Sequence, residues 1–475
     1  MTPVAGTARP LARSLVPLAD ESLPGFLLRL AHRLDQPPTE IALHTGLGGA
    51  SGTPVISIHN LLQMTAPTAH RFARRCRLTA METAALGMAR PGGPYPPLDL
   101  VARGQTQLRH TTGIPGLWNW VFTRATRYCP QCLAGDGSPI QQQHGGAWAG
   151  SWRLPVVFAC LRHQRLLASL CPDCGQDVQA RSPREQGLIP AADTMLHPAQ
   201  CRSPLIPEQP AASHTRHRHP RPRCGTLLSA GPINAGSTGA GSTGPAAPPL
   251  DHALLDLQRR LLALFTDSAL TDFPFTGSVG TPPAPATSVG RLVTAQQYFV
   301  DLRLMTVLVQ LTWPHAAPLI TSPSLADALD THLHRQQRDR EAYLDQGRRP
   351  AVSLHPGAPP ADTAACAAML QAATRLLDDQ ACAEAEQALA ALIERAFGQR
   401  TWHAVVRQSR LWCSPGLDVR IQKRMAQLRP PSRRGTVTGN RRHCPARGWL
   451  DYHRVDPVAQ PDRPYRYQRQ HVPST

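Results

Sequence analysis

Apolar residues recur every three or four positions in several stretches of the chain, the spacing that places side chains on one face of a helix. The first stretch begins after Ser22 and stops at Pro37 and Pro38; its apolar positions are Leu23, Phe26, Leu27, Leu30, Ala31 and Leu34. Similar stripes follow between 254 and 264, between 295 and 309, around Leu376, and between 389 and 397. Each apolar stripe is expected to pack into a hydrophobic core, so the pattern predicts a mainly α-helical protein.

One N-terminal segment combines a helical pattern with a high density of arginine. Between 69 and 78 the chain carries Arg71, Arg74, Arg75 and Arg77, and Thr79-x-x-Glu82 then begins another short helix as a capping box. Short helices of which one is basic are typical of a helix-turn-helix, and Arg74 and Arg75 are then candidates for DNA contact. A small helical bundle with a solvated arginine face explains the same pattern equally well.

The C-terminal part shows a second basic helical arrangement. Gly398 ends one helix, residues 401–411 form the next, and Ser414 with Pro415 supplies an N-cap and a first-turn proline for a third. A three-helix unit with a basic final helix can enter a major groove, although a solvated charged face has the same composition. The candidates for DNA contact here are Arg407, Arg420, Lys423 and Arg424.

The length of 475 residues exceeds the usual size of one core, so we expect a multidomain protein. Composition places a helical N-terminal unit at 1–125, a cysteine-containing module at 126–228, and a flexible Gly/Ser/Pro linker at 229–250. A helical C-terminal domain with a helix-turn-helix-like end follows at 251–430. The basic tail, 431–475, includes Arg433 and Arg434 as further DNA-contact candidates, and we expect it to be disordered when free.

The charge of the chain favours a polyanionic partner such as double-stranded DNA. Lys and Arg number 50 against 32 acids, a net charge of +18, and the last 78 positions hold 16 basic and 4 acidic residues. Part of the arginine content reflects a GC-rich genome, because Lys423 is the single lysine. That lysine has no glycine loop before it, which excludes a P-loop ATPase. No run of 18 apolar residues predicts a membrane span.

Eight metal-type ligands form two consecutive sets of four. They are Cys129-x2-Cys132-x27-Cys160-x2-His163 and Cys171-x2-Cys174-x26-Cys201-x22-Cys224. A two-residue spacer lets both side chains of a knuckle converge on one ion, so the spacing predicts a tandem zinc-ribbon-like module with two structural Zn²⁺ ions. Sequential pairing is preferred because 148–157 is expected to be extended and to return the chain to the first knuckle. Cys160, His163, Cys171 and Cys174 could instead enclose one ion.

Two other uses of these cysteines are disfavoured. Disulfides need an oxidising compartment, and the N-terminus lacks signal-peptide features, so we expect a cytoplasmic, nucleoid-associated protein. A thioredoxin-like motif would begin a helix after a strand, whereas these pairs are flanked by turn residues. His214, His217 and His219 lie between Cys201 and Cys224. We expect a solvated loop there, although one histidine could substitute as a ligand.

At these residues the sequence resembles the TniQ family, which includes TnsD-type target selectors of transposons. The resemblance rests on the Pro17-Leu18-x-Asp20-Glu21-Ser22-Leu23 phrase, the Arg127-Tyr128-Cys129-Pro130 run, Trp148-x3-Trp152, and the knuckles at Cys160 and Cys171. It covers about the first half of the chain. It implies a non-catalytic accessory protein that binds DNA or a DNA-bound complex and helps to direct transposase to a target.

The resemblance also implies partners and leaves alternatives. The partners would be a transposase, an AAA-type transposition regulator or a guide-RNA effector complex. A zinc-containing transcriptional regulator would use the same module with a fixed operator. A zinc-dependent nuclease or hydrolase is less favoured, because both ligand sets close with four protein donors and no HExxH motif occurs.

Overall fold

The structure is a computed structural model, and it describes residues 10–12, 14–48, 59–89, 95–98, 120–123, 125–179, 195–205, 222–229, 250–265, 287–288, 291–347, 354–378 and 382–429. Met1–Leu428 form one compact unit. Most of the predicted linker and tail lies outside the described residues, as do Arg433, Arg434 and the three histidines between Cys201 and Cys224.

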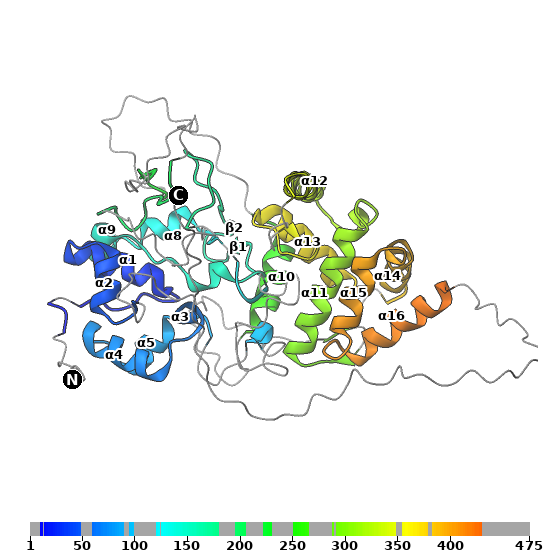
Figure 1. Ribbon diagram of the computed structural model, residues 1–475, viewed down its shortest axis with the longest axis horizontal. Helices are drawn as coiled ribbons and strands as arrows, with labels where there is room; N and C mark the ends of the chain where they lie inside the picture. Colours follow the sequence, from blue (N-terminus) through cyan, green and yellow to red (C-terminus); the bar gives the residue numbers. More distant parts are fainter. Residues whose placement is uncertain are drawn as a thin grey trace, which may run out of the picture. The chain divides into compact units, whose positions relative to one another are not determined.

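Among the residues described between 23 and 85, the helices are α1 (Leu23–Leu34), α2 (Pro38–His44), α3 (His59–Leu62), α4 (Ala66–Cys76) and α5 (Ala80–Ala85), drawn in blue in Figure 1. The Ser22 side chain caps α1 by accepting from the Gly25 N–H, and Asp35 ends it in the left-handed conformation. The predicted capping box of Thr79 and Glu82 at the start of α5 is confirmed. Local capping signals therefore set these helix boundaries.

The apolar face of α1 is buried as its pattern predicts. Phe26, Leu27 and Leu30 have no exposed surface, and α1 packs against α2, α3 and α9. Phe72 of α4 meets Phe26 edge to face, with ring centroids 6.1 Å apart. One aromatic contact thus joins α4 to the N-terminal core.

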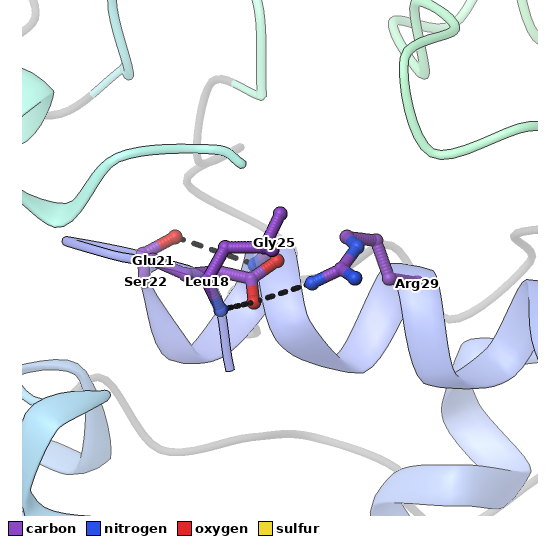
Figure 2. A network of polar contacts seen from close by, with 5 residues as sticks. All are labelled: Leu18, Glu21, Ser22, Gly25 and Arg29. Carbon is purple, nitrogen blue, oxygen red and sulfur yellow. Dashed lines mark hydrogen bonds and ion pairs between the residues drawn. The ribbon is translucent and has the colours of Figure 1, made fainter. Parts of the chain in front are cut away.

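A buried ion pair fixes the entry to α1 (Figure 2). Glu21 Oε2 accepts from Arg29 Nη1 at 2.7 Å and from the Leu18 N–H at 3.0 Å, and both charged side chains are at most 1% exposed. Burial raises the pKa of Glu21, and the Arg29 charge opposes that rise. Removing one partner would strand a buried charge. The segment from Pro17 to Leu23, on which the family resemblance partly rests, therefore has a structural role.

The central part consists of short elements: α8 (Pro130–Ala134), α9 (Pro139–His144), η2 (Gly150–Arg153), and the antiparallel pair β1 (Ala159–Cys160) and β2 (Arg165–Leu166). The expectation that 148–157 is extended is wrong, because η2 is a 3₁₀ helix. Trp152 lies within η2, and Trp148 lies two residues before its first residue. Both are buried and meet edge to face at 6.3 Å.

The C-terminal part is helical, as predicted. Its elements are α10 (His252–Ala263), β3 (Thr287–Ser288), β4 (Arg291–Leu292), α11 (Ala295–Leu311), η3 (Ala317–Leu319), α12 (Pro323–Asp345), α13 (Thr363–Arg375), α14 (Cys382–Ala396), α15 (Arg400–Ser409) and α16 (Pro415–Leu428). Helix α11 is buried over most of its length and packs against α13, α14 and α15 (Figure 1). It is the core helix of this region.

The start of α16 agrees with its predicted N-cap. The Ser414 hydroxyl accepts from the Leu417 N–H at 3.3 Å, and the Ser414 N–H donates to buried Asp301 on α11 at 2.9 Å. Helix α15 packs on α11, whereas α16 packs on α14. The predicted helix-turn-helix-like end therefore relies on α11 as a base, and its DNA-binding role stays a prediction. Among the described helices, none is both long and apolar enough to cross a membrane.

Candidate metal centres

The first set of ligands converges on one point. Nδ1 of His163 lies 3.3 Å from the sulfurs of Cys129 and Cys132 and 3.4 Å from that of Cys160. Cys129 stands at the N-cap of α8 and Cys132 lies within that helix, while Cys160 ends β1 and His163 lies in the turn before β2. A helical turn and a hairpin therefore each supply two ligands.

The second set is assembled from loops. The sulfurs of Cys171 and Cys224 are 3.8 Å apart, and those of Cys174 and Cys201 are 3.9 Å apart. Gly175 and Gly225 each follow a ligand with φ of +63° and +75°, a conformation that favours glycine. Their N–H groups donate to the carbonyls of Cys171 and Cys201, at 3.0 and 2.9 Å. The two turns aim the cysteines inward.

These distances suit a tetrahedral metal ion and exclude disulfides. A disulfide has an S–S distance of about 2.05 Å, whereas metal–sulfur bonds of about 2.3 Å give a tetrahedron with edges of about 3.8 Å. Among the described residues, the His/Cys/Asp/Glu groups with metal-site geometry are these two sets, paired in sequence order. Each set could hold one metal ion with four protein donors, an arrangement that leaves no position for a substrate.

The thiols of the first site cannot all ionise by themselves. The hydrogen bond with Cys132 lowers the pKa of Cys129 to about 2, and the same contact raises the pKa of Cys132. A bound divalent cation stabilises several thiolates together, because its charge exceeds that of any neighbouring side chain. The donor set is therefore suited to a metal ion by its electrostatics as well as by its spacing.

The comparison with protein families places these sites in context. Residues 12–167 match the family model described as TniQ. The match confirms the resemblance, and this TniQ region spans α1 to β2 with the complete first four-ligand site. The second site lies beyond it. TniQ proteins are generally non-catalytic accessory proteins of transposition. No curated protein and no solved structure matches the chain.

The first site is tied to the C-terminal helices by buried polar contacts. The Gln258 side chain of α10 accepts from the N–H groups of Phe158 and Ala159 at 2.7 and 2.6 Å and donates to the Ala159 carbonyl at 2.7 Å. The Thr363 hydroxyl at the start of α13 donates to the Leu167 carbonyl at 2.7 Å. The hairpin that carries Cys160 is thus completed by side chains from outside the TniQ region.

Arg127, two residues before the first ligand, makes a second such connection. Its guanidinium is buried and donates to the Pro360 carbonyl at 2.6 Å and to the carbonyls of Val157 and Leu154. Trp120 donates its indole N–H to the Gly357 carbonyl in the same loop, at 2.5 Å. The loop before α13 is therefore held against the TniQ region through its backbone oxygens.

Histidines connect the second site to α1. His32 Nδ1 lies 2.9 Å from His144 Nδ1, and the His32 ring packs edge to face on His197, four residues before Cys201, at 5.0 Å. Burial lowers the pKa of His144 and of His197 to about 4, and the neighbouring His32 acts in the same direction. Trp148 also donates to the Pro198 carbonyl at 2.9 Å. The second ligand set thus packs on α1 through neutral imidazoles.

The sequence pattern did not reveal these anchoring residues. Gln258 and Arg127 contact partners about 100 and 230 residues away in the chain, and no local spacing reports such a distance. The histidines belong to three separate segments with no common motif. The anchoring role of a buried polar side chain can be recognised only in the structure, where its hydrogen-bond partners are known.

The structure places the predicted DNA contacts on three helices. Arg74 of α4, Arg407 of α15 and Lys423 of α16 are exposed, and Arg420 is half-buried. The Arg75 guanidinium donates to the His44 carbonyl at the end of α2. Arg424 is half-buried and pairs with Glu394 of α14 at 2.7 Å. Arg420 and Arg424 are thus less exposed than a basic outer face of α16 would make them, and DNA contact by these residues stays a prediction.

Proposed function

We propose that this protein is a zinc-stabilised, non-catalytic adaptor that binds double-stranded DNA and directs transposition to a target site. The observation that carries the proposal is the match of the TniQ region, which encloses a complete, closed four-ligand site. A closed donor set stabilises a fold and leaves no position for a substrate. The proposed action is therefore binding alone.

Zinc is the proposed ion in both sites. Three thiolates with one imidazole, and four thiolates, are donor sets that tetrahedral zinc occupies in structural sites. The ion would contribute folding free energy by joining knuckles that lie in separate segments of the chain. At the first site it would hold α8 to the β1–β2 hairpin, and at the second it would hold Cys171 and Cys174 to two distant segments.

Charge supports DNA as one partner. The net charge of +18 and the concentration of arginine on α4 and in the C-terminal part favour a polyanion. A second partner would be the transposase, an AAA-type regulator or a guide-RNA effector complex, recognised by another face. Such a protein would act in the cytoplasm, at the nucleoid.

The proposal is tested with the full-length protein purified without chelator. We expect two zinc ions per chain by mass spectrometry, loss of helical signal on chelation, and binding to duplex DNA by fluorescence anisotropy. A transposition assay with and without the protein then measures whether insertions concentrate at particular sites. Zinc-loaded protein that binds neither DNA nor any transposition protein would contradict the proposal, as would turnover of a phosphodiester substrate.

A further inference from the structure

Helix α4 presents a cationic stripe to solvent. His70, Arg71 and Arg74 of the helix are exposed, as is Arg77 at its C-cap, whereas Phe72 and Cys76 on the opposite side are buried. We use the name α4 stripe for these four residues. The aromatic contact of Phe72 with α1 fixes which side of the helix faces outward.

Acidic side chains do not neutralise the α4 stripe. Helix α4 contains no Asp or Glu. The nearest acid along the chain, Glu82, accepts from the N–H and hydroxyl of Thr79 in the capping box, at 2.7 and 2.8 Å. Within the described part of the chain, no ion pair involves Arg71, Arg74 or Arg77. The positive charge of the stripe therefore remains available to a partner.

Arg75 differs from its neighbours and holds the stripe in place. Its guanidinium donates to the His44 carbonyl, and its own carbonyl accepts from the Leu11 N–H at 2.9 Å. These contacts join α4 to the end of α2 and to the segment before α1. A fixed helix loses less conformational entropy on binding than a mobile one, which favours affinity.

The dimensions of the stripe suit a nucleic acid backbone. Arg71 and Arg77 are six residues apart, so they are separated by about 9 Å along the helix axis. One strand of B-DNA presents a phosphate about every 3.4 Å of duplex axis, and arginine donates to phosphate oxygens through a planar fork. Two or three phosphates of one strand lie within this span.

The chemistry of the surface favours a nucleic acid duplex among polyanions, and the proposed function makes that duplex DNA. An anionic membrane is bound by cations flanked with large apolar side chains, and the other exposed residues of α4 are Ala66 and Pro67. Single-stranded nucleic acid is bound by stacking on aromatic rings, and α4 exposes no Phe, Tyr or Trp. Arginine contacts to phosphate oxygens fix the position of a protein on the duplex and carry no direct sequence information.

We infer that the α4 stripe binds the phosphate backbone of duplex DNA and sets the position of the TniQ region on the duplex without reading its sequence. The inference rests on the proposed DNA-binding function and names one surface for it. It assigns the stripe a salt-dependent part of the affinity. Sequence preference would then come from other residues or from the partner.

The test compares two double variants of the full-length, zinc-loaded protein. One is Arg71→Ala with Arg74→Ala; the matched control is Arg335→Ala with Arg338→Ala, which removes the same charge from exposed positions of α12. Binding to a labelled random-sequence DNA duplex is measured by anisotropy over a salt series. The plot of the logarithm of the binding constant against the logarithm of salt concentration has a negative slope. Its magnitude should decrease by about 2 for the α4 variant, about 1 for each arginine, and stay unchanged for the control.

Zinc content and melting temperature establish that each variant is folded. If the α4 double variant does not fold, Arg74→Glu alone replaces it, and reversal of one charge should lower affinity at low salt by at least about tenfold. Wild-type protein that binds the duplex, with both double variants indistinguishable from it, would overturn the inference and leave DNA binding intact. Binding of the same variants to duplex RNA and to phosphatidylserine vesicles is also measured. A loss of binding by the α4 variant that occurs only with these two probes would also overturn the inference. Wild-type protein that binds no duplex would contradict the DNA-binding part of the proposed function, and with it the inference.

Discussion

The two four-ligand sites have similar ligands but different surroundings. The first is joined to the C-terminal helices by the Arg127 guanidinium, the Gln258 amide and the Thr363 hydroxyl. The second packs on α1 mainly through His197, whose neighbours are His32 and His144. Guanidinium, amide and hydroxyl groups do not titrate between about pH 4 and pH 10, whereas imidazoles do. The comparison teaches that two centres with similar donors can differ in their response to acid.

The largest expected effect separates the two sites by ligand removal. Cys132→Ser should lose one metal ion per chain and the folded TniQ region, because both the α8 turn and the hairpin end at that site. Cys174→Ser should lose one ion and loosen its own loops while α1 to β2 stay folded. Metal analysis with thermal melting measures both, and apparent binding energies of about 10–16 kcal/mol for structural zinc indicate the scale.

Equal melting temperatures for the two serine variants would remove the distinction between the sites. Unchanged metal content in both would contradict the ligand assignment itself. Cys76→Ser is the matched control, because this cysteine is buried against the N-terminal core and belongs to neither ligand set.

A smaller effect is expected when the contact beside the first site is removed. Arg127→Met keeps the apolar volume but leaves the carbonyls of Val157, Pro360 and Leu154 without their buried donor. The free energy of unfolding should fall by about 3–5 kcal/mol. Urea denaturation measures the loss, and exposed Arg162→Met serves as the control with less than about 0.5 kcal/mol. A loss as small as the control's would show that the loop before α13 is not held by Arg127.

The smallest effect concerns pH and the second site. The pKa of His144 falls from 6.5 to about 4 on folding, so between these values only the unfolded chain takes up the proton. Stability should therefore be complete above about pH 6.5 and decline as pH falls toward 4, by at most about 3 kcal/mol per histidine. Denaturation at several pH values with zinc content monitored should give a flatter profile for His144→Gln than for wild type. Coincident profiles would show that this imidazole does not limit acid stability.

Local signals made much of the fold predictable. The Ser22 cap, the Thr79–Glu82 capping box and the Ser414–Pro415 helix start are each decided within four residues. The two ligand groups in the structure are those of the preferred sequential pairing. Helix caps and metal-ligand spacings of this kind can be predicted directly from the sequence.

Partners across long distances could not be predicted. Arginine on a helix looks the same in sequence whether it faces water, as Arg74 does, or bonds a neighbouring helix, as Arg75 does. The expectation of an extended 148–157 failed because Gly150–Arg153 form a 3₁₀ helix, whose Trp152 packs on Trp148. In both cases tertiary contact decides what local pattern leaves open.

The bond from Gln258 to β1 has a consequence for how the protein is made. The N–H groups of Phe158 and Ala159 donate to the side chain of Gln258, which is synthesised about 100 residues after them. At about 5–20 residues per second, a ribosome needs roughly 5–20 s to supply it. During that interval the two N–H groups of the nascent hairpin have water in place of the Gln258 amide as their acceptor. A fragment that ends at residue 167, where the family match ends, would lack Gln258 and therefore this acceptor for the two N–H groups.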